Sequence, residues 1–269
     1  MVPHPIILLP PSEGKASGGE GPPLDLESVS FGEFNKSRIL LIKALGQLSK
    51  KPRVAQKTLG VKGVALDKAR ADNADVMNSP TLPAIERYTG VMYDSIDYES
   101  LDEAAKRVFG NSTLIMSGLF GIVRPFDLIP TYKLKMGAKI RANKDCAAIW
   151  KPLISKSLAK TIEHGVIWDL LPNEHSAAWD PSQVLCDVRF TVKFLEAGAD
   201  GKLKTINHWS KALKGALVRH LVVNPEAASR EESALELLAG FSHPEGYEYR
   251  ADLTTDVVGA KELLFIKDA

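Results

Sequence analysis

Residues 113–127 read TLIMSGLFGIVRPFD, and no other part of the chain says more about its fold. The run at 113–116 has the length and composition of a buried β-strand. It leads directly into Ser117-Gly118, a polar pair typical of a turn. Because open α/β sheets bind ligands beyond the carboxyl ends of their strands, this stretch predicts an α/β protein with a ligand site here.

Further strands and helices are predicted on both sides of this run. Strands are expected at 6–9, 166–170 and 184–194, and the last returns through a turn at 197–201 to a strand at 202–208. Helices are expected at 34–48, 101–109, 147–163 and 211–223, with Gly110 ending the second and Ser210 as the N-cap of the last. The late hairpin favours a mixed sheet. We therefore expect an α/β (α+β) fold, a mixed β-sheet with surrounding helices, in a single domain spanning residues 1–269.

The composition is that of an ordinary globular protein, with 45% hydrophobic and 25% charged residues and a net charge of +1. No apolar run approaches the roughly 18–20 residues of a membrane span, and we expect no signal peptide. Two cysteines, Cys146 and Cys186, are too few for a disulfide framework and fit a reducing cytoplasm. The histidines show no metal-ligand spacing. We expect a cytoplasmic protein with no metal, no cofactor and no membrane partner.

The charges are segregated along the chain. Residues 43–70 contain eight basic side chains against one acidic, residues 133–160 again eight against one, and residues 202–219 five against none. If these blocks meet in space, they form a positive patch for a polyanion. Solvated helix faces are an equally good interpretation.

Three segments carry candidate functional groups. After the first strand, Ser12, Glu13 and Lys15 bring a hydroxyl, a carboxylate and an ammonium to one turn, which lacks the pattern of a P-loop. After the 113–116 strand come Ser117, Gly118, Gly121, Arg124, Asp127 and Tyr132. Asp127 is either a base or the partner that holds Arg124 in a structural turn. Glu174-His175-Ser176 is the best local acid–base cluster, although sequence neighbours do not all point one way.

The helix at 211–223 has a basic side. Lys211, Lys214 and Arg219 fall within roughly one 140° arc at 100° per residue, opposite a row of leucines. Such a face suits phosphate contacts, and a solvated lysine face is the alternative.

Together these segments resemble one family, the YaaA-type peroxide stress proteins. The resemblance rests on residues 10–15, on Tyr88-Thr89-Gly90, on residues 117–137, and on Lys211, Gly215 and Arg219, and it continues through residues 240–247. It implies a cytosolic protein that supports survival of hydrogen peroxide stress through lowered free iron. It also implies an unusual α/β fold with a positively charged cleft, a helix-hairpin-helix element and binding of duplex DNA. The sequence alone does not place that element.

Two functions from different classes are therefore expected. The first is a DNA-binding stress protein without sequence specificity, whose phosphate-binding residues are Lys15, Arg124, Lys211, Lys214 and Arg219. The alternative is an enzyme acting on a nucleotide, nucleoside or DNA base, for example by cleaving an N-glycosidic bond. Its candidate catalytic residues are Ser12, Lys15, Ser117, Asp127 and Tyr132, and its ligand-binding loops contain Tyr88, Thr89, Gly90, Gly118 and Gly121. The scattered histidines argue against a dedicated iron-handling protein.

Overall fold

A mixed β-sheet forms the centre of the protein. The computed structural model describes residues 4–141, 144–162, 164–198, 202–205 and 209–268. Five strands run parallel in the order β14 (Ala260–Lys267), β10 (Val188–Ala197), β9 (Val166–Asp169), β1 (Ile6–Leu9) and β4 (Thr113–Ser117). Their apolar side chains are almost all buried, which explains why the runs at 6–9, 113–116 and 166–169 are readable as strands.

Antiparallel strands complete the sheet, so the expectation of a mixed sheet is confirmed. β5 (Gly121–Val123) folds back on β4, while β12 (Glu248–Tyr249) and β13 (Thr255–Val257) pair with β14. The late hairpin is present as β10 and β11 (Leu203–Thr205), whose register pairs Ala197 with Leu203. β10 begins at Val188 rather than at 184. The expected turn residues 199–201 and the strand end at 206–208 lie outside the described residues.

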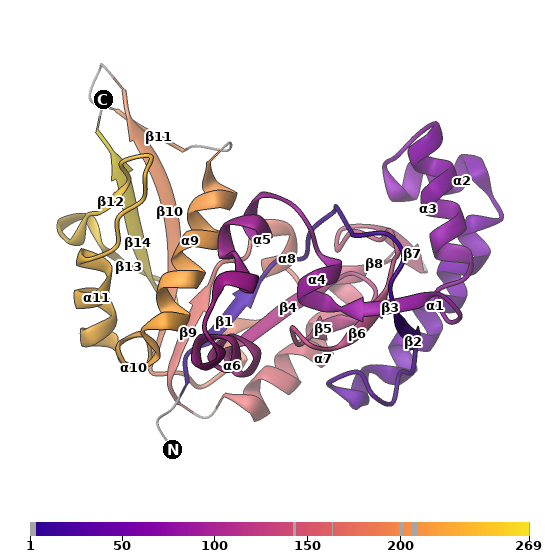
Figure 1. The fold of residues 1–269 in the computed structure, drawn as a ribbon, viewed down its shortest axis with the longest axis horizontal. Coiled ribbons are helices and arrows are strands. Elements are labelled where there is room, and N and C mark those ends of the chain that lie inside the picture. The colour runs from indigo at the N-terminus through magenta and orange to yellow at the C-terminus, as the bar shows by residue number, and fades with distance from the viewer. Residues whose placement is uncertain (1–3, 142–143, 163, 199–201, 206–208, 269) are drawn as a thin grey trace.

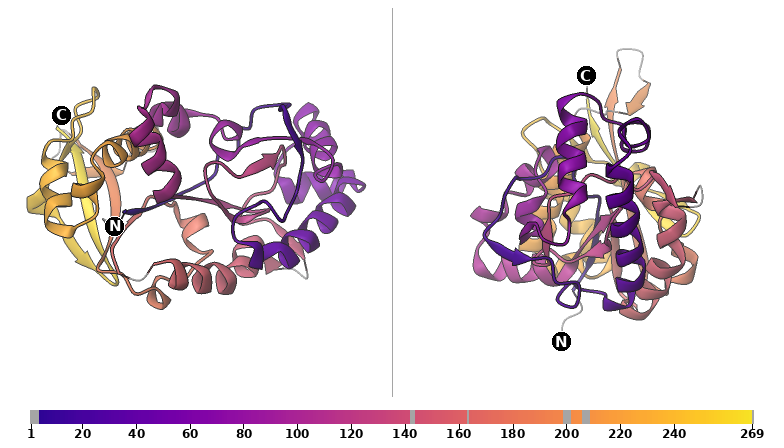
Figure 2. Two further views of the ribbon diagram at one scale, coloured as in Figure 1. Left: turned by 60° about the horizontal axis from the view of Figure 1, so that its bottom comes forward. Right: turned by 90° about the vertical axis from the view of Figure 1, so that its right-hand side faces the viewer.

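Helices cover the sheet and extend the molecule at one end. α9 (Ser210–Val223) packs against β10, α5 (Val91–Ile96) and α6 (Glu103–Ser112), and α7 (Cys146–Thr161) packs against β5. Figures 1 and 2 show α1 (Asn35–Ser49), α2 (Pro52–Leu59) and α3 (Val64–Ala74) grouped at the end opposite the C-terminal strands, near which α10 (Pro225–Ala228) and α11 (Glu231–Ala239) lie. No helix in the described part of the chain is long and apolar enough to cross a membrane.

A small antiparallel sheet supports the segment before the site. It consists of β2 (Gly21–Pro23), β3 (Pro80–Pro83) and β6 (Leu128–Pro130) and leads into the short helix α4 (Ala84–Arg87). The buried Arg87 guanidinium donates to the carbonyls of Ala16, Gly18, Pro80 and Ile129, and so ties three chain segments together. A two-stranded ribbon, β7 (Lys139–Arg141) and β8 (Lys144–Asp145), precedes α7.

Two expected helix boundaries are wrong. Helix α6 runs through Gly110 to Ser112. Gly110 does not end the helix but allows close packing within it, since an added Cβ there would lie 2.4 Å from the ring of Phe126. Helix α9 starts at Ser210 itself, with Trp209 at the N-cap position, so Ser210 is not the cap.

Candidate functional site

Lys15 lies at the centre of the best-formed polar site. β1 ends at Leu9, and the chain then passes through two prolines into a turn that pairs Lys15 with Tyr88 in an isolated antiparallel bridge. The Lys15 Nζ donates to the carbonyl of Ser12 at 3.0 Å. It lies over the ring of Tyr132, 4.4 Å from the ring centre, and 5.1 Å from that of Tyr88.

This environment changes the protonation of Lys15. Burial, followed by repulsion from the Lys133 ammonium, lowers the pKa of Lys15 from 10.5 to about 7. Near neutral pH a large share of the molecules therefore carries an uncharged amine here. Only the uncharged amine is a nucleophile or a base, so Lys15 has the state that amine catalysis requires.

A chain of hydroxyl groups lies directly behind Lys15. The Tyr132 hydroxyl is 2.8 Å from Ser117 Oγ on one side and 2.8 Å from the Tyr88 hydroxyl on the other. Burial raises the pKa of Tyr132 to about 12 and also raises that of Tyr88 well above its usual value. Both phenols therefore stay protonated at physiological pH. Ser117 Oγ also accepts from the Phe120 amide, so it anchors Tyr132 from beneath the pocket.

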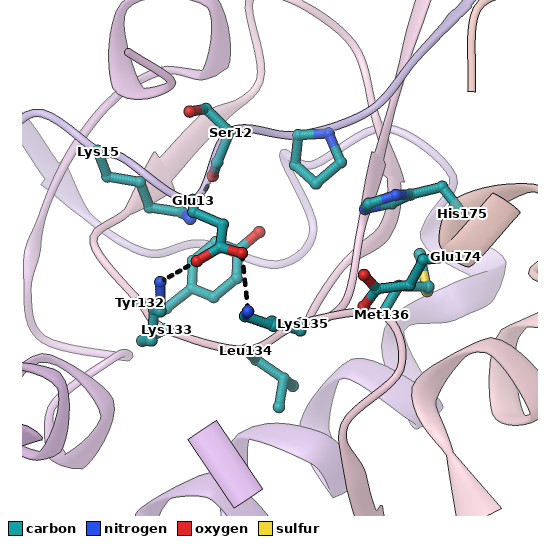
Figure 3. A pocket seen from close by; sticks show the side chains of 11 residues that line it. Ser12, Glu13, Lys15, Tyr132, Lys133, Leu134, Lys135, Met136, Glu174 and His175 are labelled. Carbon is teal, nitrogen blue, oxygen red and sulfur yellow. Dashed lines mark hydrogen bonds and ion pairs between the residues drawn. The ribbon is translucent and has the colours of Figure 1, made fainter. Parts of the chain in front are cut away.

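Glu13 spans the front of the pocket (Figure 3). Its carboxylate pairs with the Lys133 ammonium at 2.9 Å and with the Lys135 ammonium at 2.8 Å. Partial burial opposes ionisation of Glu13, but the hydrogen bonds from both lysines outweigh it and lower its pKa to about 2. Glu13 is thus an anion at any physiological pH and serves as a charge partner rather than as a proton donor.

The opposite wall comes from α8 (Asn173–Ser176). Glu174 Oε1 accepts from the Gly137 amide at 2.7 Å, and His175 points toward the pocket from the other side (Figure 3). Among the described residues His175 Nδ1 is buried without a hydrogen-bond partner, and burial lowers its pKa, which favours the neutral ring. Ser176 lies on the far side of α8, so the expected Glu-His-Ser cluster is split between two pockets.

The pocket opens toward α3 as well. Besides the space enclosed by Ser12, Glu13, Tyr132 and α8, a second cavity of about 150 Å³ lies between Lys15 and α3. Its far wall comes from the α2–α3 connection and from α3, namely Val61, Ala65, Lys68, Ala69 and Asp72. Lys15 is therefore accessible from a surface that two helices border.

Arg124 and Asp127 lie outside this site. Asp127 accepts from the backbone and hydroxyl of Ser30 at 3.1 and 2.7 Å and from the Arg124 amide at 2.8 Å. The Arg124 guanidinium extends the other way, to the Asn111 carbonyl and over the ring of Phe31. Asp127 thus stabilises a turn through the Ser30 and Arg124 amides and the Ser30 hydroxyl, and its carboxylate and the Arg124 guanidinium extend in different directions.

The three cations of α9 do not share one exposed face. Lys214 is largely buried and donates to the Leu170 carbonyl, while Arg219 donates to the carbonyls of Ile96 and Asp97. Lys211 is exposed. The three side chains therefore diverge, because α9 is covered by α5 on one side and by the sheet on the other. None of them lines the Lys15 pocket.

The glycines and the Tyr88–Gly90 segment shape the site. The Thr89 amide donates to the Gly14 carbonyl and holds the 12–15 turn in place. A Cβ on Gly118 would lie 2.7 Å from the Leu134 carbonyl oxygen, so this glycine lets the segment carrying Lys133 and Lys135 approach β4. Gly121 has φ of 78°, a value that favours glycine.

Sequence reasoning missed Lys133 and Lys135 as site residues, and it noted the Glu13 carboxylate without assigning it a role. The available signal was the i, i+2 spacing of the two lysines in a segment without helical pattern, since such spacing places side chains on one face of an extended chain. Their common partner, Glu13, lies 120 residues away from Lys133, and that pairing depends on the tertiary fold.

Replacing Asp127 by asparagine tests its structural role. We expect the variant to lose roughly 1–3 kcal/mol of unfolding free energy, because an amide NH₂ would face N–H or O–H donors at one of the two oxygen positions. Urea unfolding measures this loss, and function per folded molecule should be unchanged. If function falls in a variant that keeps its full stability, Asp127 takes part in chemistry instead.

Fold and site define an α/β protein with a lysine-centred pocket at the carboxyl edge of a mixed sheet. The family model described as "Peroxide stress protein YaaA" matches residues 6–253. A UPF0246 protein of Streptomyces coelicolor is 35% identical over 248 residues, 92% of each chain. One of Corynebacterium efficiens is 36% identical over 240 residues, 87% of this chain and 92% of the relative. The chain belongs to the YaaA peroxide stress protein family.

Proposed function

We propose that this protein is an enzyme that acts on a nucleoside unit of DNA with the Lys15 amine as nucleophile. The observation that carries the proposal is the position of Lys15: a largely buried amine with a pKa of about 7, on a side chain that is partly exposed to a cavity opening onto the α2–α3 connection. The peroxide-stress role of the family then corresponds to removal of DNA damage driven by iron and peroxide in the cytoplasm.

The chemistry follows from the groups around Lys15. The amine attacks C1′ of the sugar, the C1′–N bond breaks, and the base leaves with the electron pair. The ring C1′–O4′ bond then opens to give an imine between C1′ and Lys15. The two protons of the amine end on the released base and on O4′. Water hydrolyses the imine and restores the amine.

The helix-hairpin-helix element implied by the family is proposed to be α2, residues 60–63 and α3. α2 ends at Gly60 with φ of 68°, and Gly63, with φ of 57°, precedes α3, so two glycines shape a four-residue connection. Exposed basic side chains surround it: Lys51, Arg53, Lys57, Lys62 and Lys68. Backbone N–H groups and cations of this kind bind DNA phosphates without reading sequence.

Borohydride trapping tests the chemistry. A duplex oligonucleotide with one abasic site presents an aldehyde directly, and one with a single oxidised base requires the full reaction. We expect sodium borohydride to link wild-type protein to both through Lys15, as peptide mapping would locate. The Lys15→Met variant should give no adduct, while the exposed control Lys211→Met should react normally. An adduct that persists in Lys15→Met, or none with either duplex, contradicts the proposal.

Salt dependence tests the DNA-binding surface separately. Each phosphate contact contributes about 0.9 to the slope of log affinity against log salt concentration. Replacing Lys57 and Lys62 by alanine should therefore lower that slope by roughly 2, whereas the same change at Lys211 should leave it unaltered. A flat salt dependence of the wild type, or a slope that responds only to Lys211, would place the DNA elsewhere.

A further inference from the structure

A separate cavity, larger than those beside Lys15, lies on the other side of α8. Its volume is about 380 Å³, and it begins where β9 ends at Asp169 and extends along β10. Asn173 and Ser176 face it from α8, whose other side carries Glu174 and His175 of the Lys15 pocket. The helix turn thus separates two pockets at the same edge of the sheet. None of the chemistry proposed for Lys15 uses the cavity beside Asp169.

Its floor contains three charged groups. Asp169 and Arg189 form an ion pair with 2.7 Å between Oδ2 and Nη1, and their side chains are only 3% and 13% exposed. The other Asp169 oxygen accepts from the Leu171 amide. The third group is Lys214, whose Nζ donates to the Leu170 carbonyl at 2.9 Å. At the rim Lys193 pairs with Glu262 at 2.9 Å and adds no net charge.

These charges do not cancel. Asp169 neutralises Arg189, both of its oxygens are engaged, and the ammonium of Lys214 has a carbonyl as its hydrogen-bond acceptor. Burial lowers the pKa of Lys214, and attraction to the Asp169 carboxylate, which already pairs with Arg189, only partly opposes this shift. A buried cation is costly unless it is paired, so the cavity floor has an excess positive charge available to an anion.

We propose that this cavity binds a small organic molecule through its anionic head group, a phosphate or a carboxylate, held by Lys214 and Arg189. Arg189 is well suited to the task, because Asp169 and the Gly259 carbonyl fix its guanidinium and the ring of Trp179 packs against it. The remaining walls mix hydroxyl groups of Thr191 and Ser210 with apolar surface of Leu171 and Val257, which suits the body of such a ligand.

The size of the cavity indicates a molecule rather than a bare ion. A volume of about 380 Å³ lies within the roughly 300–1,000 Å³ typical of small-molecule sites. A mononucleotide-sized phosphomonoester fits this range. The site also gives Lys214 a function that differs from the DNA contact expected from the sequence, since a ligand must enter the cavity to reach its ammonium.

Calorimetric titration of the full chain tests this proposal with three probes: inorganic phosphate, adenosine monophosphate and acetate. We expect the wild type to bind at least one of them, phosphate and the nucleotide if the head group is a phosphate, acetate if it is a carboxylate. Lys214→Met should weaken that binding by roughly tenfold or more, a loss of about 1.4 kcal/mol. The matched control Lys211→Met, an exposed lysine of the same helix that does not line the cavity, should stay within about twofold of the wild type.

Urea unfolding without a bound probe distinguishes lost binding from lost folding in Lys214→Met. Lys214→Met should unfold at the same or a higher urea concentration than the wild type, because it removes a largely buried ammonium whose hydrogen bond goes to a neutral carbonyl, so lost binding does not reflect lost folding. Unchanged affinity in Lys214→Met, no binding of any probe to the wild type, or displacement of the bound probe by a duplex oligonucleotide would overturn the proposal. Borohydride trapping at Lys15 is independent of these results.

Discussion

Lys15→Met is expected to make the protein more stable at pH 6 to 7, by on the order of 3 kcal/mol, while removing its proposed activity. The folded-state pKa of Lys15 is about 7, against 10.5 for an unperturbed lysine. Each pKa unit of this difference corresponds to about 1.4 kcal/mol of unfolding free energy. The value of about 3 kcal/mol is smaller than the full product because Lys15 keeps some exposure and its surroundings relax. Methionine fills similar space beside Tyr88 and Tyr132 without a charge to bury.

The stability gained by Lys15→Met over the wild type should decrease as the pH rises. Below pH 7 Lys15 is protonated in both the folded and the unfolded chain, so the wild type carries the full cost of the buried charge. Between pH 7 and 10.5 the unfolded chain binds more protons at this position than the folded chain, so wild-type stability rises with pH. The advantage of Lys15→Met should therefore shrink steadily across this window.

Urea unfolding of both proteins at pH 6, 8 and 9.5 would measure this difference. The control Lys211→Met removes an exposed charge and should match the wild type at all three pH values within about 0.5 kcal/mol. A difference between Lys15→Met and the wild type that is the same at pH 6 and 9.5 would mean that Lys15 is not perturbed in the folded protein. The proposed nucleophile would then lose its physical basis.

Arg38→Met is expected to destabilise the protein by about 4 kcal/mol, the largest loss that we predict for one side chain. The Arg38 guanidinium is fully buried on α1 and donates to the carbonyls of Phe120 at 3.0 Å, Ile122 at 3.1 Å and Ser30 at 2.7 Å. It thereby holds the β4–β5 hairpin against the helix group. Each buried carbonyl left without a donor costs roughly 1–3 kcal/mol. A water molecule in place of the guanidinium does not donate to all three carbonyls.

The size of this loss is measured by urea unfolding at pH 7. Arg53→Met, an exposed guanidinium on α2, is the matched control and should change stability by less than about 0.5 kcal/mol. Arg38→Lys should rescue little, because one ammonium does not span the diverging carbonyls that a planar guanidinium reaches. A loss below about 1 kcal/mol for Arg38→Met would show that backbone contacts alone hold the hairpin.

Most of the sheet was predictable because local composition determines it. The strands at 6–9, 113–116 and 166–169 are short apolar runs bounded by turn residues, and the hairpin of β10 and β11 follows from its turn signal. Helix ends were less predictable: Gly110 stops a helix by propensity, yet contact with Phe126 gives it a packing role within α6. Strand order and the Arg38 and Arg87 anchors involve pairs of segments far apart in sequence.

The site, too, has residues that the sequence identified and residues that only the fold placed. Ser12, Lys15, Ser117 and Tyr132 were recognised by residue type after strand ends, and the structure brings them together, whereas Arg124, Asp127 and the α9 cations extend elsewhere. The sequence by itself determined the family, the mixed sheet and the edge at which polar groups gather, because those depend on local patterns. Only the tertiary structure decided which side chains share a pocket. Side-chain direction and burial depend on distant neighbours, and it is Tyr88, Tyr132 and Lys133 that lower the pKa of Lys15 or enclose it.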